Sequence, residues 1–274
     1  LTREDLLYAL MLASANDAAV ALAESVAGSE EKFVELMNKR ARELNLNNTH
    51  FVNSHGLDAD GHYSSAYDLA LLAREGLSNE LFSNVVTTME RSVPWPGHPW
   101  DRYLYNRNKL LTTYKGARGV KTGYTSGAGL CLVGAAQRGN LKLITAVMNS
   151  PNIYDDTQKL LDYGFNNFEA VVVEEAKQVP DVKVKKGTKT SVSIMPEQEV
   201  VVALLPEEKE QLSFKLEIAD QLVAPVKKGE VVGKGRVLLN GKELIEIDYL
   251  AQEEVPKKPP IWKRFFNWFK SLFS

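Results

Sequence analysis

The first 168 residues mix helical and strand-like patterns of apolar positions. Stretches rich in Ala and Leu at 3–12 and 17–27 predict two helices, and residues 29–44 predict a third that is amphipathic. The first two helices are interrupted at Ser14-Ala15-Asn16-Asp17, where Asn16 or Asp17 is suited to capping the second helix. The chain therefore places short polar side chains at a helix break close to its start.

Strand-like patterns follow a fourth predicted helix at 69–75. Apolar runs at 119–124, 129–136 and 141–148 predict three strands, the last two joined at Arg138-Gly139-Asn140. A closing helix is expected at 155–168. Together these elements predict a mixed α/β domain over residues 1–168.

Beyond residue 168 the pattern changes to short alternating strands. Residues 191–195, 212–218 and 244–249 each place apolar side chains on one face, and Asn240-Gly241 is a strong hairpin signal. A small all-β sandwich is therefore expected at 169–251. The segment "QEEVPKKPP", residues 252–260, reads as a linker rich in proline and charge.

The last fourteen residues, 261–274, form an amphipathic pattern. At about 100° per residue, their apolar side chains fall within an arc of roughly 160°, with every polar residue on the other side. A helix of this length is about 21 Å long, too short to cross a hydrocarbon layer of about 30 Å. The tail therefore predicts a helix that lies in a membrane interface; docking on the protein itself or on a partner is the alternative.

Composition excludes some partners. Lys and Arg number 33 against 35 Asp and Glu, and no motif for binding nucleic acid occurs. Cys131, the single cysteine, lies in an apolar strand pattern and is expected to be a buried small side chain. No cofactor and no metal site are predicted: "DADG" after His55 lacks the remaining ligands of a calcium loop, and a tight turn is the simpler interpretation.

The candidate chemistry begins at Lys121-Thr122-Gly123, at the start of a hydrophobic strand. An ammonium and a hydroxyl at a strand edge suit an extended peptide that ends in a carboxylate, and a glycine lets its backbone approach closely. Ser14-x-Asn16 precedes this tripeptide. These two motifs match, in the same order, the second and third elements of the three-part signature Ser-x-x-Lys, Ser-Asp-Asn and Lys-Thr-Gly.

With "NNTHFVNSHGLDADGHYSSAYDLA" and "NRNKLL", these motifs closely resemble the D-alanyl-D-alanine carboxypeptidases, the low-molecular-mass penicillin-binding proteins. The resemblance covers the whole chain. It implies a penicillin-binding or β-lactamase-like α/β (α+β) transpeptidase domain, then a small β sandwich and an amphipathic anchor helix. It also implies a serine-type hydrolase that removes the terminal D-alanine from peptidoglycan stem pentapeptides ending in D-Ala-D-Ala, with β-lactams as inhibitors.

The same resemblance assigns roles to six residues. Ser14 is expected to relay protons to the leaving amine, and Asn16 to hold the amide side of the substrate. Lys121 and Thr122 are expected to bind the terminal carboxylate, with Gly123 clearing space. The N–H of Tyr124 is expected to form half of the oxyanion hole.

The nucleophile is the departure from the family pattern. The family's Ser-x-x-Lys lies several dozen residues before the serine–asparagine motif, whereas here Ser14 is preceded by only 13 residues. The one Ser-x-x-Lys, Ser29 to Lys32, comes after that motif, and Ser29 reads as a helix N-cap. The expectation is that the nucleophile lies upstream of Leu1, with a signal peptide that directs the protein to the extracytoplasmic face of the bacterial membrane.

Two alternatives remain open at the sequence level. The chain could be a cell-wall-binding protein that keeps the pocket without catalysis, or, less readily, a β-lactamase, since those enzymes usually lack the β domain and the tail. "PWPGHPW", residues 94–100, reads as a rigid surface loop, although Trp95 or Trp100 could line a substrate groove.

Overall fold

The structure is a computed structural model that describes residues 1–259, and the chain divides into two compact units. The N-terminal unit covers Leu1–Asn167, and the C-terminal unit begins at Phe168. The amphipathic helix predicted at 261–274 lies outside the described residues. Among the described residues, no helix has the length and apolar character that a membrane crossing requires.

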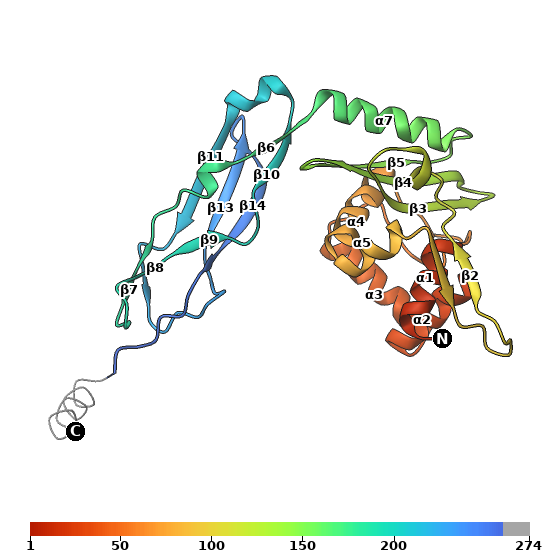
Figure 1. The fold of residues 1–274 in the computed structure, drawn as a ribbon, viewed down its shortest axis with the longest axis horizontal. Helices are drawn as coiled ribbons and strands as arrows, with labels where there is room; N and C mark the ends of the chain where they lie inside the picture. Colours follow the sequence, from red (N-terminus) through yellow and green to blue (C-terminus); the bar gives the residue numbers. More distant parts are fainter. Residues whose placement is uncertain (260–274) are drawn as a thin grey trace. The chain divides into compact units, whose positions relative to one another are not determined.

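The N-terminal unit is built on a three-stranded antiparallel sheet with the order β3-β4-β5 (Figure 1). Helix α7 packs against β4 and β5 on one face, while α4 and α5 lie on the other. The predicted mixture of helices and strands is therefore confirmed. The elements are α1 (Arg3–Ala13), α2 (Asn16–Ala27), α3 (Glu30–Glu43), α4 (Ala66–Ser78), α5 (Glu80–Thr87), α6 (Leu110–Thr113), α7 (Ile153–Asn167), β1 (Glu90–Val93), β2 (Arg102–Tyr105), β3 (Ala117–Thr125), β4 (Gly129–Arg138) and β5 (Leu141–Val147).

Apolar residues on α1 hold the helical part of this unit against the hairpin β1-β2. Leu12 is fully buried and packs with Val93 and Leu104, one from each strand of the hairpin. At roughly 1.5–3 kcal/mol for each fully buried large side chain, this cluster fixes the end of α1 relative to β2. The residues that follow α1 and those that follow β2 are thereby held near each other.

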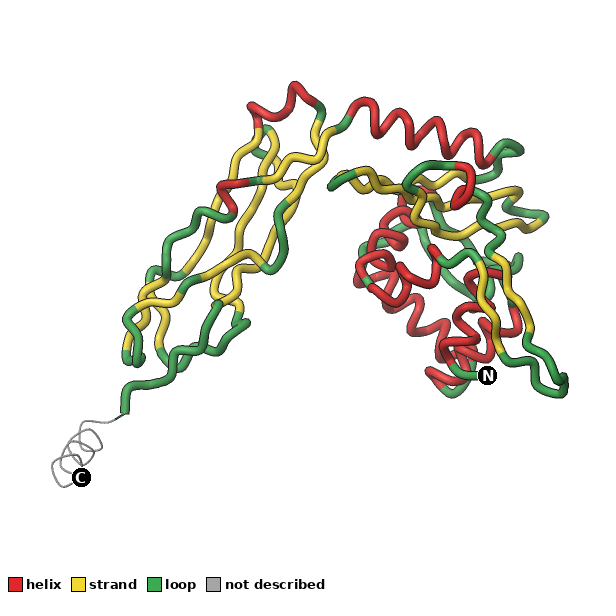
Figure 2. The backbone as a smooth tube through the Cα atoms, viewed as in Figure 1, coloured by secondary structure: helices red, strands yellow, loops and turns green. Residues whose placement is uncertain are grey.

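The C-terminal unit consists mainly of β-strands, as its alternating pattern predicts, together with two short 3-10 helices (Figure 2). A four-stranded sheet has the order β11-β13-β14-β9, and Asn240-Gly241, both at positive φ, make the predicted hairpin turn. Tyr249 is fully buried, and its hydroxyl donates to the carbonyl of Ala176 at 2.6 Å. The remaining elements are β6 (Glu169–Val172), η1 (Glu174–Ala176), β7 (Val182–Lys185), β8 (Ser191–Val192), β9 (Ile194–Pro196), β10 (Val201–Leu204), η2 (Pro206–Gln211), β11 (Leu212–Ile218), β12 (Gln221–Val223), β13 (Val231–Leu239) and β14 (Lys242–Ala251).

Two local predictions are wrong. Neither Asn16 nor Asp17 caps α2: the N-cap is Ala15, which has no side-chain acceptor, and Asn16 is already the first helical residue. Cys131 is half-buried rather than buried, because it lies near the open end of β4, where its Sγ donates to the carbonyl of Ala128 at 3.6 Å.

Candidate active site

The break between α1 and α2 gives Ser14 an unusual backbone. Ser14 ends α1 in the left-handed region, with φ 58° and ψ 46°, and the N–H of Ala15 donates to the carbonyl of Ala9 at 3.2 Å. A left-handed conformation costs a residue with a side chain roughly 1–2 kcal/mol. A strained residue held by its surroundings is a common feature of functional sites.

Lys121 on β3 meets Ser14 directly. Its Nζ donates to the Oγ of Ser14 at 2.9 Å and to the carbonyl of Thr122 at 2.9 Å. An ammonium group has three donors, so these two bonds fix its position and leave one N–H for a ligand. The structure therefore brings together the two sequence elements that are farthest apart in the predicted site.

Burial changes the acid–base behaviour of this lysine. Loss of hydration and, to a smaller extent, the positive charge of Arg107 together lower the pKa of Lys121 from 10.5 to about 8. Lys121 is then mainly protonated at pH 7 and can lose its proton within the physiological range. It can act as a carboxylate-binding cation and also exchange a proton with Ser14.

Strand β3 presents the rest of the predicted motif at an exposed edge. Among the described strands, β3 pairs only with β4, which leaves its other edge open to an extended peptide. Gly123 is exposed, Thr122 is half-buried, and the side chain of Tyr124 is 68% exposed. Asn16 is exposed as well, and none of its side-chain atoms forms a hydrogen bond within residues 1–259.

Arg107 is a cation near this site to which the sequence analysis gave no role. Its N–H donates to the carbonyl of Leu12 at 3.1 Å, two residues before Ser14. The neighbouring asparagines shape this segment: the Oδ1 of Asn106 accepts from the N–H of Asn108 at 2.9 Å. The sequence feature that could have identified Arg107 is the triplet Asn-Arg-Asn at 106–108. The two short amide side chains stabilise a turn, and the charged residue lies between them.

The other candidates have structural roles. Ser29 is the N-cap of α3 and accepts from the N–H of Lys32 at 3.3 Å, as its interpretation as a cap predicts. Asp58 accepts from the N–H of Gly127 at 3.0 Å, and His62 accepts from the N–H of Val52 at 3.1 Å. No group of three or more potential metal ligands occurs in the part of the chain that the structure describes.

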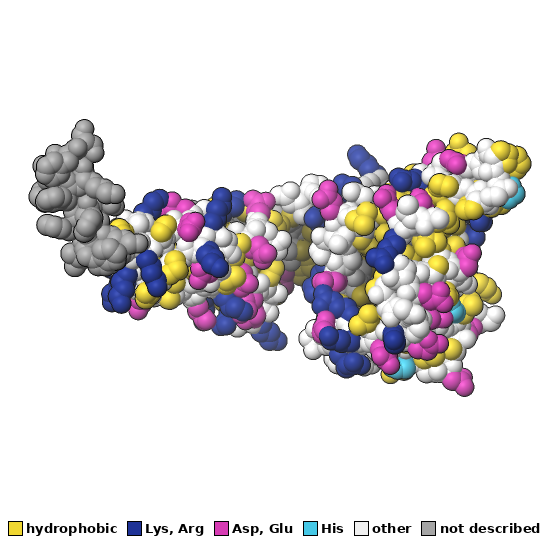
Figure 3. Space-filling view, turned by 90° about the horizontal axis from the view of Figure 1, so that it is seen from below, with side chains coloured by type: hydrophobic (Ala, Val, Ile, Leu, Met, Phe, Trp, Pro, Cys, Tyr) yellow, Lys and Arg dark blue, Asp and Glu magenta, His cyan; other side chains and the backbone are white. Residues whose placement is uncertain are grey.

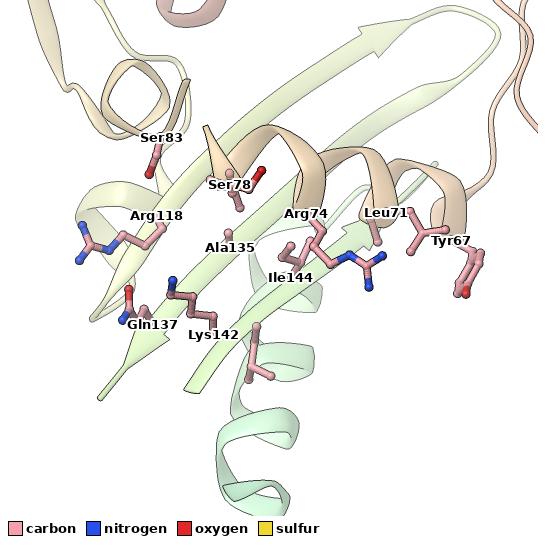
Figure 4. Close-up of a pocket in the computed structure, with 13 residues that line it drawn as sticks. Tyr67, Leu71, Arg74, Ser78, Ser83, Arg118, Ala135, Gln137, Lys142 and Ile144 are labelled. Atoms are coloured by element: carbon pink, nitrogen blue, oxygen red, sulfur yellow. The ribbon is translucent and has the colours of Figure 1, made fainter. Parts of the chain in front are cut away.

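A cavity of about 660 Å³ lies between α4 and the sheet, away from these residues (Figure 4). Leu71 of α4 and Ile144 of β5 are among the apolar side chains that line it, and Arg74, Arg118 and Lys142 are among the charged ones. None of the predicted site residues lines this cavity. Size alone therefore does not identify the site; the contact between Lys121 and Ser14 does.

Two protein families match different parts of the chain. Residues 1–152 match the family described as D-alanyl-D-alanine carboxypeptidase, and residues 168–257 match the C-terminal domain of penicillin-binding protein 5.

Individual proteins are similar over most of the chain. D-alanyl-D-alanine carboxypeptidase DacF of Bacillus subtilis is 35% identical over 264 residues, which cover 94% of this chain and 67% of that protein. DacC of Escherichia coli, which carries the same description, is 34% identical over 98% of this chain and 70% of that protein. The crystal structure of penicillin binding protein 5 from Haemophilus influenzae has a TM-score of 0.64 and 32% identity, and the match covers 92% of this chain and 74% of that one. The chain thus spans about two thirds of the length of these two curated relatives.

Proposed function

Because the chain belongs to the D-alanyl-D-alanine carboxypeptidase family, which is serine-type, we propose that its N-terminal unit binds and trims peptidoglycan stem peptides that end in D-Ala-D-Ala. The observation that carries the proposal is the 2.9 Å bond between Lys121 Nζ and Ser14 Oγ beside the open edge of β3. An ammonium at an open strand edge suits the carboxylate of an extended peptide.

Each residue has a physical role in this proposal. Lys121 and the hydroxyl of Thr122 receive the terminal carboxylate, and Gly123 lets the last residue of the peptide lie close to β3. Because Lys121 donates into a lone pair of Ser14, the proton of the Ser14 hydroxyl is free to point at the leaving amine. Asn16 holds the amide side of the substrate, and the N–H of Tyr124 donates to the oxyanion, a contact worth about 3 to 4 kcal/mol.

The nucleophile in this proposal is a serine outside the given 274 residues. It attacks the carbonyl carbon of the penultimate D-alanine, the amide C–N bond breaks, and the terminal D-alanine leaves with a proton relayed through Ser14. Water then hydrolyses the ester and restores the serine. The support is that Ser29, which begins the chain's one Ser-x-x-Lys, has its Oγ engaged as the N-cap of α3.

Labelling with a fluorescent penicillin tests the proposal. The 274-residue chain should not be acylated, whereas the chain preceded by its natural upstream sequence should be. In the longer chain, Ser14→Ala should slow acylation about 10² to 10⁴-fold, the usual contribution of a positioned proton-transfer group. Labelling of the short chain at Ser29 would contradict the assignment.

A second candidate is a non-catalytic cell-wall-binding protein. Such a protein would differ from the enzyme only in lacking the nucleophile. The sequence upstream of Leu1 therefore distinguishes the two candidates. An in-frame Ser-x-x-Lys there supports the enzyme, and a start codon directly before Leu1 supports the binding protein. In both cases we propose that residues 261–274 hold the protein at the extracytoplasmic face of the membrane.

A further inference from the structure

The hairpin β1-β2 carries an exposed group of aromatic side chains, and the active-site proposal gives it no role. Its connecting loop, residues 94–101, projects from the N-terminal unit (Figure 1). Trp95 is 40% exposed and Trp100 is 59% exposed, and on β2 Tyr103 and Tyr105 are 64% and 62% exposed. Figure 3 shows hydrophobic side chains and a histidine gathered at one end of the N-terminal unit. Exposed aromatic clusters of this kind mark interaction sites.

The loop is built to hold its rings in place. His98 donates its N–H to the carbonyl of Trp95 at 3.0 Å across a turn in which Gly97 has φ +85°. The His98 ring lies 4.0 Å from that of Trp95 and 5.4 Å from that of Trp100, measured between centroids. Three prolines in the loop restrict its backbone further. Such a rigid surface loses little entropy when it binds.

The two faces of the hairpin are different. The inner face carries Val93 and Leu104, which are buried against α1. The outer face carries Tyr103 and Tyr105 on β2. Ser92 lies directly opposite Tyr103 on β1, and Glu90 lies opposite Tyr105. Ser92 Oγ also donates to Asp101 Oδ2 at 3.0 Å, which places a further carboxylate beside the aromatic rings. The outer face thus combines flat rings with hydroxyl and carboxylate groups.

This combination suits a sugar chain. A pyranose ring has an apolar C–H face that packs on an aromatic ring, while its hydroxyls need acceptors at the edge, which Glu90 and Asp101 provide. Residues 90–105 contain two arginines, two carboxylates and no lysine, so they offer little attraction to an anionic membrane. The tail at 261–274, by contrast, pairs its aromatic residues with Lys and Arg.

Strand β2 leads from this surface to the candidate active site. Arg107, whose charge acts on Lys121, follows Tyr103 by four residues, which is at most about 13 Å along an extended chain. Trp100 is seven residues from Arg107, which is at most about 23 Å on the same measure. An extended stem pentapeptide spans about 17 Å, so a peptide whose carboxylate is bound at Lys121 has its sugar-linked end at a comparable distance.

We propose that the outer face of β1-β2 and its loop form a glycan-binding surface, which holds the sugar chain to which the stem peptides are attached. This proposal rests on the proposed function for the identity of the polymer, but it concerns a separate binding surface.

Binding to peptidoglycan strands from which all peptides have been removed tests the surface without the peptide site. We expect the 274-residue chain to sediment with these strands, soluble N-acetylglucosamine oligomers to compete, and the double variant Trp100→Ala, Tyr103→Ala to bind at least tenfold more weakly. Both side chains are more than half exposed, so the variant should keep its melting temperature.

Two control variants separate this result from other causes. Tyr67→Ala removes a ring that is 72% exposed on α4 and should bind glycan normally. Lys121→Met should also bind peptide-free glycan normally, even though the proposed function predicts that it loses peptide binding. Glycan binding that is absent in the natural chain, or unchanged in the double variant, would overturn the proposal. Loss of binding only to vesicles of phosphatidylglycerol and phosphatidylethanolamine would assign the surface to a membrane instead.

Discussion

At the scale of the residue, the central feature is Lys121, whose lowered pKa lets it lose its positive charge near physiological pH. Lys121 is held between Ser14 Oγ and the carbonyl of Thr122, and burial lowers its pKa to about 8. A free lysine stays charged to about pH 10. Here the charge is present below pH 8 and is lost as the pH rises through that value, so binding that depends on this charge must change with pH.

The affinity for a peptide with a free terminal carboxylate should therefore be constant below pH 7 and fall about tenfold per pH unit above pH 8. Isothermal titration from pH 6 to 9.5 measures this dependence. Lys121→Arg is the control, because a guanidinium stays charged throughout and its affinity should not change with pH. An affinity that rises between pH 7 and 9 would mean that the neutral amine is the binding form.

At the scale of the element, Gly123 in β3 and Gly134 in β4 differ in how much room there is for a side chain. A Cβ at Gly123 would meet only the Cβ of Cys131, at 4.0 Å, whereas a Cβ at Gly134 would lie 2.7 Å from Thr157 Cγ2 and 2.9 Å from Thr145 Oγ1. Neither glycine has a positive φ. Gly134 is thus required by packing inside the protein, and Gly123 is not.

This difference gives a matched pair of variants. Gly134→Ala should destabilise the N-terminal unit by about 1 to 3 kcal/mol, because an added methyl forces the packed sheet apart. Gly123→Ala should leave the melting temperature unchanged but weaken binding of the peptide, because the new methyl occupies the space that its backbone needs. Thermal unfolding and peptide titration on both variants check this. Normal peptide binding by Gly123→Ala would remove this glycine from the site.

The sequence predicts some of these elements better than others, for physical reasons. Strands β3 to β5 and helices α1 to α4 have strong local patterns, and their predicted ends lie within a few residues of the observed ones. The hairpin β1-β2 was missed, because strands of four residues are too short to show alternation and their partners lie beyond a proline-rich loop.

The site was predictable only in part for a similar reason. The motifs identify Ser14 and Lys121, but their contact depends on a left-handed residue between two helices, which no local propensity indicates. Arg107 was missed because its position near Lys121 depends on how the segment after β2 folds back on α1.

At the scale of the whole molecule, the chain consists of two compact units followed by a short C-terminal segment. The N-terminal unit carries the candidate active site, and the C-terminal unit is an all-β module with its own apolar core. The last fourteen residues carry the amphipathic pattern. If these residues anchor the protein to a membrane, as we propose, their removal should leave the candidate site intact, because every residue of that site belongs to the N-terminal unit.

Deleting residues 261–274 should release the protein from anionic vesicles and leave peptide binding at Lys121 unchanged. Sedimentation with vesicles, together with peptide titration on the same preparation, measures both effects. If the shortened chain partitioned as the full chain does, the interfacial helix would be the wrong interpretation of the tail.

The most direct test of the account compares two peptides that end in D-Ala-D-Ala, one with a free terminal carboxylate and one with a terminal amide, in titrations against the full chain at pH 7. The account predicts that the free acid binds at least tenfold more tightly than the amide, and that this preference disappears in Lys121→Met. Equal binding of the two peptides to the natural chain, or a preference that survives in Lys121→Met, would contradict it.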